Sequence, residues 1–112
     1  MSQPQRADSS VEDSSGVLRF ALLQCQPVAS KAEALQRLEE TARVAHEQNA
    51  KLLITPEMYL TGYNIGPQAC RELAETLDGP SLNRVRAICR EYQMAIVLGF
   101  PERGGDAVYN SA

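Results

Sequence analysis

The sequence predicts an α/β fold that begins with a strand, a helix and a second strand. Short apolar runs at residues 17–25, 51–55 and 94–99 are separated by segments in which apolar residues recur every three or four positions. Each run is closed by a proline one to two residues later, and proline cannot donate to a sheet ladder. This alternation is typical of parallel strands joined by right-handed helical crossovers. We therefore expect a strand–helix–strand start and a mixed sheet with helices on one face.

The chain has 112 residues, the length of one domain. Residues 1–16 contain very few apolar side chains and are predicted to form a disordered tail. Residues 17–112 are left to build a modest core.

Composition excludes several classes of protein. The net charge is −3, and the only loose grouping of basic residues, Arg84, Arg86 and Arg90, falls along one exposed helix, so we expect no nucleic-acid partner. No apolar run approaches the length of a membrane span, and no secretory signal pattern is present, so a cytoplasmic location is expected. Three unevenly spaced cysteines and one histidine, His46, predict neither a disulfide framework nor a metal site.

The first helix has the clearest start signal in the chain. Ser30 and Glu33 have the spacing of a capping box, in which the serine is the N-cap. The helix then shows an apolar stripe and is expected to end near residues 48–50. The stripe consists of Leu35, Leu38, Ala42 and Ala45.

The second half of the chain is predicted as follows. After the strand at 51–55, a loop spans 58–68 and a short helix 69–77. Ser81 is expected to cap a helix that runs to Tyr92, and the strand at 94–99 follows. Phe100 and Pro101 are expected to end that strand, with a hairpin connection at 102–107 and a fourth strand from 108.

Glu57 is the candidate catalytic residue. It lies just beyond the strand that ends at Pro56, and in open α/β sheets ligands bind beyond the carboxyl ends of the strands. A carboxylate there can serve as a general base, or it can be a solvated loop residue with no chemical role. Tyr59 and Tyr63, in the following loop, are candidates for substrate binding or for simple packing.

The remaining chemistry-bearing residues point to no site of their own. Cys25 has no evident activating base nearby in sequence, and Cys70 and Cys89 are expected to pack in the core. No glycine-rich phosphate turn follows the first strand, which argues against a nucleotide-binding domain. These residues alone leave the reaction undetermined.

Several motifs in register resemble the carbon–nitrogen hydrolase (nitrilase) superfamily. They are residues 56–63 around Glu57, residues 21–24 in the first strand, residues 96–102 in the third, and Tyr109-Asn110-Ser111. Within the superfamily, residues 56–66, 77–80 and 101–104 are most similar to bacterial 5-aminopentanamidases. Those enzymes hydrolyse 5-aminopentanamide to 5-aminopentanoate and ammonia in lysine degradation.

The resemblance implies an αββα sandwich, often homo-oligomeric, and a cofactor-free Glu–Lys–Cys mechanism on a small amide. Glu57 matches the family's general base, which takes the proton of the cysteine thiol. The lysine helps to hold the tetrahedral oxyanion. Nitriles and N-carbamoyl amines are alternative substrates within the same superfamily.

The family's lysine and cysteine lie downstream of the Tyr-Asn-Ser motif, and no residue of this chain matches either of them. We therefore expect residues 17–112 to be the N-terminal portion of a longer hydrolase domain, inactive by itself. The alternative is a short non-catalytic α/β interaction module. A reading frame that continues past Ala112 into a lysine and a cysteine in family context favours the hydrolase.

Overall fold

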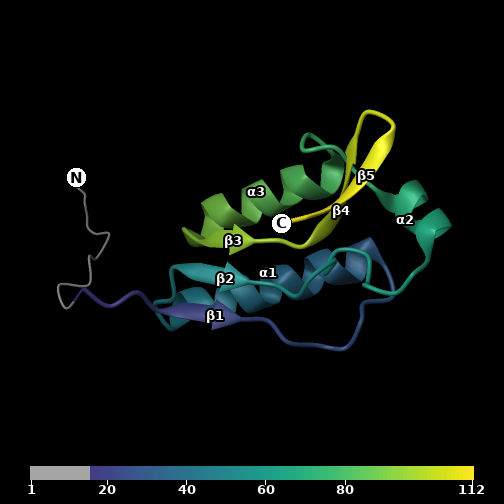
Figure 1. Cartoon of the computed structure of the whole chain (residues 1–112). Helices are drawn as coiled ribbons and strands as arrows, with labels where there is room; N and C mark the ends of the chain where they lie inside the picture. The colour runs from purple at the N-terminus through teal and green to yellow at the C-terminus, as the bar shows by residue number, and fades with distance from the viewer. Residues whose placement is uncertain (1–15) are drawn as a thin grey trace.

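The computed structural model describes residues 16–112, so the predicted tail, apart from Gly16, lies outside the described residues. The elements are β1 (Phe20–Leu22), α1 (Lys31–Glu47), β2 (Leu52–Ile54), α2 (Pro67–Leu73), α3 (Pro80–Tyr92), β3 (Ala95–Val97), β4 (Phe100–Gly104) and β5 (Ala107–Ser111). Figure 1 shows their arrangement. The α/β class is confirmed.

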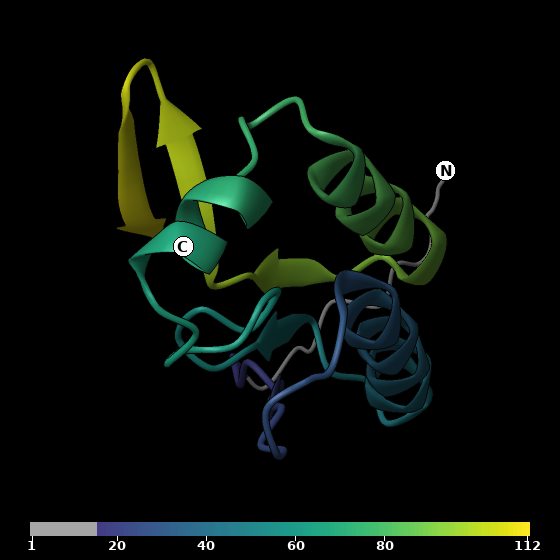
Figure 2. The same cartoon turned by 90° about the vertical axis from the view of Figure 1, so that its right-hand side faces the viewer.

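The first three strands form a parallel sheet in the order β1-β2-β3, with β2 in the centre. Two successive right-handed crossovers in the same direction place both connecting helices on one face. Figure 2 shows α1 and α3 side by side on that face. The predicted strand–helix–strand start and its one-sided helical layer are therefore confirmed.

The core lies between the sheet and these two helices. Ala21, Leu53 and Ile96 are level with one another in the register and face the helices. On α1 the buried residues follow one stripe, namely Ala34, Leu38, Ala42 and Ala45. Val85 and Ile88 of α3, which lies beside α1 on the same face, complete the core. Leu35, predicted within the α1 stripe, is only half-buried at its border.

The opposite face of the sheet is apolar and uncovered by any described residue. Strand side chains alternate, so the neighbours of the core residues point away from the helices. They form two rows across the sheet, Phe20-Leu52-Ala95 and Leu22-Ile54-Val97. Phe20 and Leu22 are more than half exposed, at 53% and 59%. A face of this kind is suited to packing against another layer.

The start of α1 follows the predicted capping geometry with one difference. The Ser30 Oγ accepts a hydrogen bond from the Glu33 backbone N–H at 3.1 Å. The Glu33 carboxylate reaches back one residue further than expected, to the N–H of Ala29 at 3.3 Å. At the other end, Asn49 has a positive φ of 66°, which stops the helix and turns the chain into β2.

The helices α2 and α3 differ from prediction at their boundaries. α2 ends at Leu73 rather than 77 because Glu75 pairs with β4: its N–H donates to Pro101 O at 3.1 Å, and its carbonyl accepts from Arg103 N at 2.8 Å. The prediction that Ser81 caps α3 is wrong. The helix begins at Pro80 with Gly79 as N-cap, because the Ser81 hydroxyl is occupied by the Glu75 carboxylate.

The prediction that residues 100–101 end a strand and 102–107 connect a hairpin is also wrong in detail. Phe100–Gly104 is itself a strand, β4, which pairs antiparallel with β5. Only Gly105 and Asp106 form the turn, and Gly105 has the positive φ, 64°, that a two-residue hairpin turn requires. The described strands therefore form a parallel sheet and a separate two-stranded hairpin rather than one mixed sheet.

The three parallel strands are shorter than the apolar runs that predict them, with three residues each. Their length is limited by β2, which is central and is cut off by Asn49 on one side and Pro56 on the other. Among residues 16–112, no helix combines the length and the apolar content needed to cross a bilayer.

Candidate functional site

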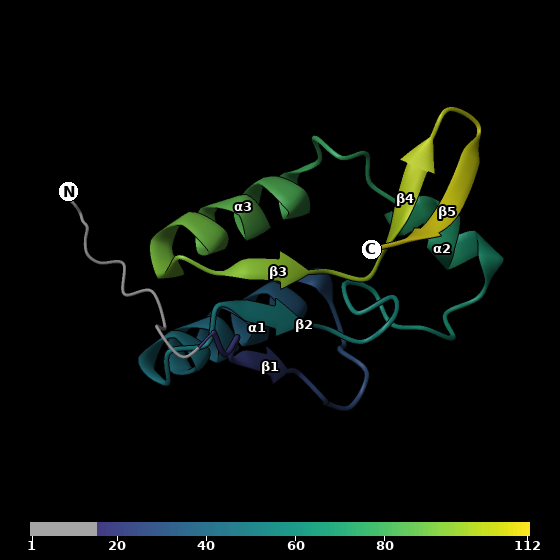
Figure 3. The same cartoon turned by 60° about the vertical axis from the view of Figure 1, so that its left-hand side comes forward.

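The carboxyl ends of β1, β2 and β3 point towards the end of the molecule where the hairpin and α2 lie (Figure 3). β2 leads into Thr55, a buried residue whose backbone N–H and hydroxyl both donate to Val97 O at 3.0 Å. The same hydroxyl accepts from Gly99 N at 3.0 Å. Thr55 therefore fixes the end of β2 to the chain that leaves β3, two residues before Glu57.

Glu57 sits where two backbones pass very close together. A Cβ placed on Gly99 would lie 2.5 Å from Pro56 O and 2.6 Å from Met58 N, so a side chain at this position would displace the backbone on both sides of Glu57. The N–H of Leu60 donates to Gly99 O at 3.1 Å. Gly99 thus allows the loop that carries Glu57 to lie flat against the end of β3.

Met58, the residue after Glu57, adopts a left-handed conformation with a φ of 53°. Non-glycine residues occupy this region rarely, and such strain often occurs at functional sites. Here it is stabilised because Met58 is buried and its carbonyl accepts from Gly62 N at 2.8 Å. These contacts fix the backbone of the turn at 57–62, from which the Glu57 side chain extends.

The Glu57 carboxylate is exposed, and Glu57 forms none of the ion pairs found within residues 16–112. Its Oε2 accepts a hydrogen bond from the side-chain amide of Asn110, on β5. A carboxylate that is held by one neutral donor, and has its second oxygen uncommitted, can accept a proton from a reacting group.

A groove of about 470 Å³ opens beside this carboxylate. Glu57 itself is not among its lining residues; the groove reaches it through Met58, which follows Glu57, and Asn110, which binds Glu57. The lining is aromatic, aliphatic and neutral polar, with no charged residue, and consists of Met58, Tyr63, Asn64, Ile65, Gly66, Pro67, Cys70, Val108, Tyr109 and Asn110. Such a groove suits the aliphatic part of a small molecule, with neutral polar groups available to its polar ends.

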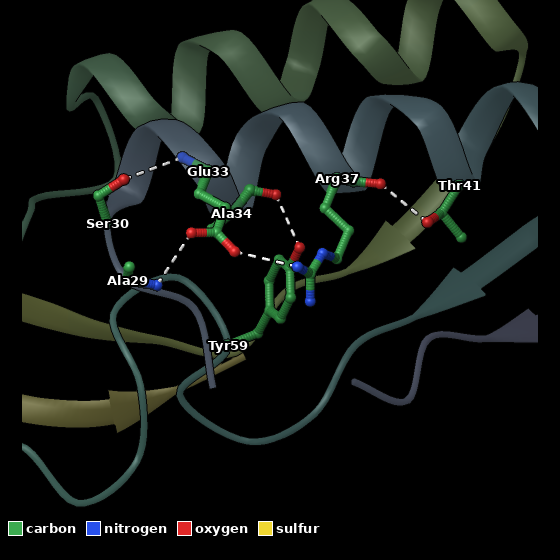
Figure 4. A network of polar contacts seen from close by, with 7 residues as sticks. All are labelled: Ala29, Ser30, Glu33, Ala34, Arg37, Thr41 and Tyr59. Carbon is green, nitrogen blue, oxygen red and sulfur yellow. Dashed lines mark hydrogen bonds and ion pairs between the residues drawn. The ribbon is translucent and has the colours of Figure 1, made fainter. Parts of the chain in front are cut away.

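The two candidate tyrosines are placed differently. Tyr63 lies in the groove and is 68% exposed. Tyr59 does not line the groove, and of the two alternatives for that residue the structure shows packing. It is turned into the core, where its hydroxyl donates to Ala34 O at 2.7 Å (Figure 4). Its ring is needed to fill the space beneath α1, and burial raises the pKa of Tyr59 to about 12.

Four residues that line the groove lie outside the loop at 58–68, namely Cys70, Val108, Tyr109 and Asn110. The sequence places Asn110 only within the Tyr-Asn-Ser motif, at the start of the predicted fourth strand, and that position is the only signal for its contact with Glu57. Cys70 was expected in the core, but it is half-buried and lines the groove from α2. All three cysteines are free thiols. Within residues 16–112, no cluster of three His, Cys, Asp or Glu side chains could hold a metal ion.

A second polar cluster fixes the position of the hairpin. Glu75 is buried and accepts hydrogen bonds from Lys31 Nζ at 2.6 Å, Ser81 Oγ at 2.5 Å and Ser81 N at 2.9 Å. Burial by itself raises the pKa of the Glu75 carboxyl, but the bonds from Lys31 and Ser81 outweigh burial and lower that pKa. The Glu75 backbone pairs with β4, so this cluster links α1, α3 and the hairpin that carries Asn110.

The fold and the geometry define a class of protein: an α/β domain with a carboxylate fixed beside a groove at the carboxyl end of its parallel sheet. Comparison with known proteins then shows the family. Residues 19–112 match the carbon-nitrogen hydrolase family, and the chain belongs to it.

Several relatives are similar over most of this chain. A Pseudomonas protegens protein named "Hydrolase in pqqF 5'region" is 48% identical over 96 residues, which cover 84% of this chain and 33% of the relative. The omega-amidase of Bos taurus is 30% identical over 94 residues, 83% of this chain and 33% of the relative. This chain therefore spans about a third of the length of these relatives.

Solved structures agree in fold. An amidase from Nesterenkonia sp. superimposes with a TM-score of 0.67 at 30% identity, over 79% of this chain and 34% of that amidase. A carbon-nitrogen hydrolase superfamily protein from Xanthomonas campestris gives a TM-score of 0.70 at 24% identity, over 83% of this chain and 34% of that protein. The described residues thus correspond to part of a carbon-nitrogen hydrolase domain.

Proposed function

We propose that the protein containing this chain hydrolyses the carbon–nitrogen bond of a small aliphatic amide, with Glu57 as general base. The observation that carries the proposal is the position of Glu57: exposed, outside any ion pair of residues 16–112, and bound through Asn110 to the rim of an uncharged groove. Family membership and the similarity to amidases support amide hydrolysis.

In this mechanism Glu57 takes the proton of a cysteine thiol supplied by the rest of the protein. The thiolate attacks the amide carbon, and the carbon–nitrogen bond breaks as ammonia leaves with the proton that Glu57 returns. Glu57 then deprotonates a water molecule, which attacks the thioester. The carbon–sulfur bond breaks, the acid is released and the thiol is regenerated. A lysine, also outside this chain, stabilises the oxyanion in both steps.

Within this proposal the substrate is 5-aminopentanamide and the products are 5-aminopentanoate and ammonia, as in lysine degradation. The support is the similarity of residues 56–66, 77–80 and 101–104 to the 5-aminopentanamidases. The groove has the size for a short acyl chain, and the exposed ring of Tyr63 offers a surface to its methylene groups. The full-length enzyme is proposed to be cytoplasmic, homo-oligomeric and independent of cofactors.

Ammonia release by the full-length protein tests the proposal. The wild-type enzyme should turn over 5-aminopentanamide faster than a nitrile or an N-carbamoyl amine of the same chain length. Glu57→Gln, which keeps the shape but cannot accept the proton, should lower kcat by about 10²-fold or more with the fold intact. Glu72→Gln, an exposed position on α2, is the matched control and should retain wild-type kcat.

The 112-residue chain alone should release no ammonia, since it lacks the matched lysine and cysteine. Wild-type turnover by Glu57→Gln would overturn the assignment of the base. Preference for a nitrile over the amide would overturn the substrate class.

A further inference from the structure

We infer that Asn110 is a positioning residue for Glu57: its side-chain amide holds one carboxylate oxygen, so that the other oxygen is directed at the reacting thiol and water. This inference rests on the proposed function of Glu57 as a base. It concerns a contact between two residues separated by 53 positions in the sequence, Asn110 Nδ2 and Glu57 Oε2.

The chemistry of the pair fits this role. A carboxamide presents N–H donors and carries no charge. It can therefore orient a carboxylate without an ion pair, which would stabilise the ionised form and weaken the carboxylate as a proton acceptor. A lysine or arginine at the same place would neutralise the carboxylate, and an aspartate would repel it. Of the charged side chains in residues 16–112, none forms an ion pair with Glu57. Asn110 therefore orients the base and leaves Oε1 for chemistry.

The register of the hairpin determines where Asn110 points. In the β4–β5 ladder Asn110 is opposite Pro101, next to the pair Phe100 and Ser111. Side chains alternate along a strand, so Asn110 points to the other side from its neighbours Tyr109 and Ser111. The Ser111 hydroxyl bonds Glu102 within the hairpin at 2.8 Å, whereas Asn110 leaves the hairpin to reach Glu57.

The hairpin itself is fixed to the domain independently of Glu57. The backbone of Glu75 pairs with Pro101 and Arg103 of β4, and the Glu75 carboxylate is bound to Lys31 and Ser81. On the other side, Thr55 and Gly99 fix the loop that carries Glu57. Because both partners are anchored separately, the hydrogen bond between them adds orientation to Glu57 and little to the stability of the fold.

The test compares Asn110→Ala with Asn83→Ala in the full-length enzyme. Asn83 is also an exposed asparagine, whose Nδ2 donates to Asp78 O and whose Oδ1 accepts from Arg86 Nη1, but it lies on α3 away from the groove. Asn110→Ala should lower kcat about 10- to 100-fold, because misplacement of a catalytic group by about 1 Å has an effect of this size. KM should stay within roughly twofold of wild type and the Tm within roughly 2 °C, as expected of a loss confined to the chemical step.

Asn83→Ala should leave kcat and KM unchanged. Asn110→Asp, which has the same size but adds a carboxylate facing Glu57, should lower kcat further than Asn110→Ala. A wild-type kcat in Asn110→Ala, while Glu57→Gln is inactive, overturns this inference alone and leaves the proposed function standing. A rise in KM with unchanged kcat also overturns it, because Asn110 would then bind substrate. Wild-type activity of Glu57→Gln overturns the proposed function and this inference together.

Discussion

Removal of the Glu75 carboxylate should destabilise the protein by more than any exposed charge does. Glu75 is 8% exposed and accepts three hydrogen bonds, one from Lys31 and two from Ser81. In Glu75→Ala the N–H and hydroxyl of Ser81, itself 5% exposed, lose their acceptor in a site with little access to water. Lys31 is 26% exposed and can regain water.

The magnitude follows from these environments. Each buried donor left without an acceptor costs about 1–3 kcal/mol, and breaking a buried ion pair by removing one partner costs about 3–5 kcal/mol. We expect Glu75→Ala to lower the free energy of unfolding by about 3–5 kcal/mol. Glu75→Gln keeps one acceptor for Ser81 and should cost about 1–2 kcal/mol. Glu72→Ala, an exposed acid on α2, should stay within about 0.5 kcal/mol of wild type.

Native-state hydrogen exchange is the most direct assay because it reports opening at single amides. The Arg103 amide bonds the Glu75 carbonyl, so it reports whether the hairpin has left the domain. A loss of about 3–5 kcal/mol corresponds to exchange faster by roughly 200- to 5,000-fold at this amide. Two results together would refute the claim that the Glu75 carboxylate holds the hairpin to the domain. They are unchanged Arg103 exchange in Glu75→Ala and an unfolding free energy within roughly 0.5 kcal/mol of wild type.

The pH dependence of stability has a definite sign at this site. Because the folded-state pKa of Glu75 lies below its ordinary value of 4.5, its contribution is present above that value and is lost as the pH falls through the folded pKa. The stability difference between wild type and Glu75→Gln should therefore shrink in acid, which denaturant titrations at a series of acidic pH values can measure.

Two further predictions concern the sheet and the core. The double variant Leu22→Lys with Val97→Lys, on the uncovered sheet face, should raise the monomer fraction of the isolated 112-residue chain in size-exclusion chromatography. The control Val44→Lys, on the exposed side of α1, should not. Equal association of wild type, the double variant and the control would show that this face does not cause the association. Tyr59→Phe should cost about 1 kcal/mol at neutral pH by loss of the bond to Ala34 O, with kcat retained. Because the pKa of Tyr59 is raised from 10.0 to about 12, its stabilising contribution is full below pH 10 and is lost as the pH rises through about 12, so wild type but not Tyr59→Phe should show that alkaline loss in thermal unfolding. An alkaline loss of the same size in both proteins would contradict the burial of this hydroxyl.

The local features of the fold could be predicted from the sequence because they depend on residues close together in the chain. The Ser30 cap, the buried stripe of α1 and the stop at Pro56 each depend on a few neighbouring side chains. Ser81 was misassigned because its partner, Glu75, lies outside the helix it was expected to cap. The strand at 100–104 does not follow from the sequence because Pro101 has no N–H to donate to a ladder. In the structure the Pro101 carbonyl takes part instead, by accepting from the N–H of Glu75.

The candidate site divides in the same way. Glu57 could be found because a carboxylate directly after a buried strand is a local pattern, and Tyr63 could be found because it lies in the loop that follows. The direction of Tyr59 into the core could not, since it depends on the Ala34 carbonyl of another element. Asn110 also depends on the register of a hairpin that the sequence predicted incompletely.

The position of Glu57, the proposed base, is nevertheless determined by contacts within this chain, which spans about a third of the relatives' length. Thr55, Gly99 and Met58 fix the backbone of Glu57, and Asn110 fixes its carboxylate, all through contacts among described residues. The uncovered rows of the sheet, headed by Phe20 and Leu22, offer a surface on which further chain can pack. If such a layer carries the nucleophile, the base is already positioned before the layer packs, because the contacts that hold Glu57 all lie among residues 16–112.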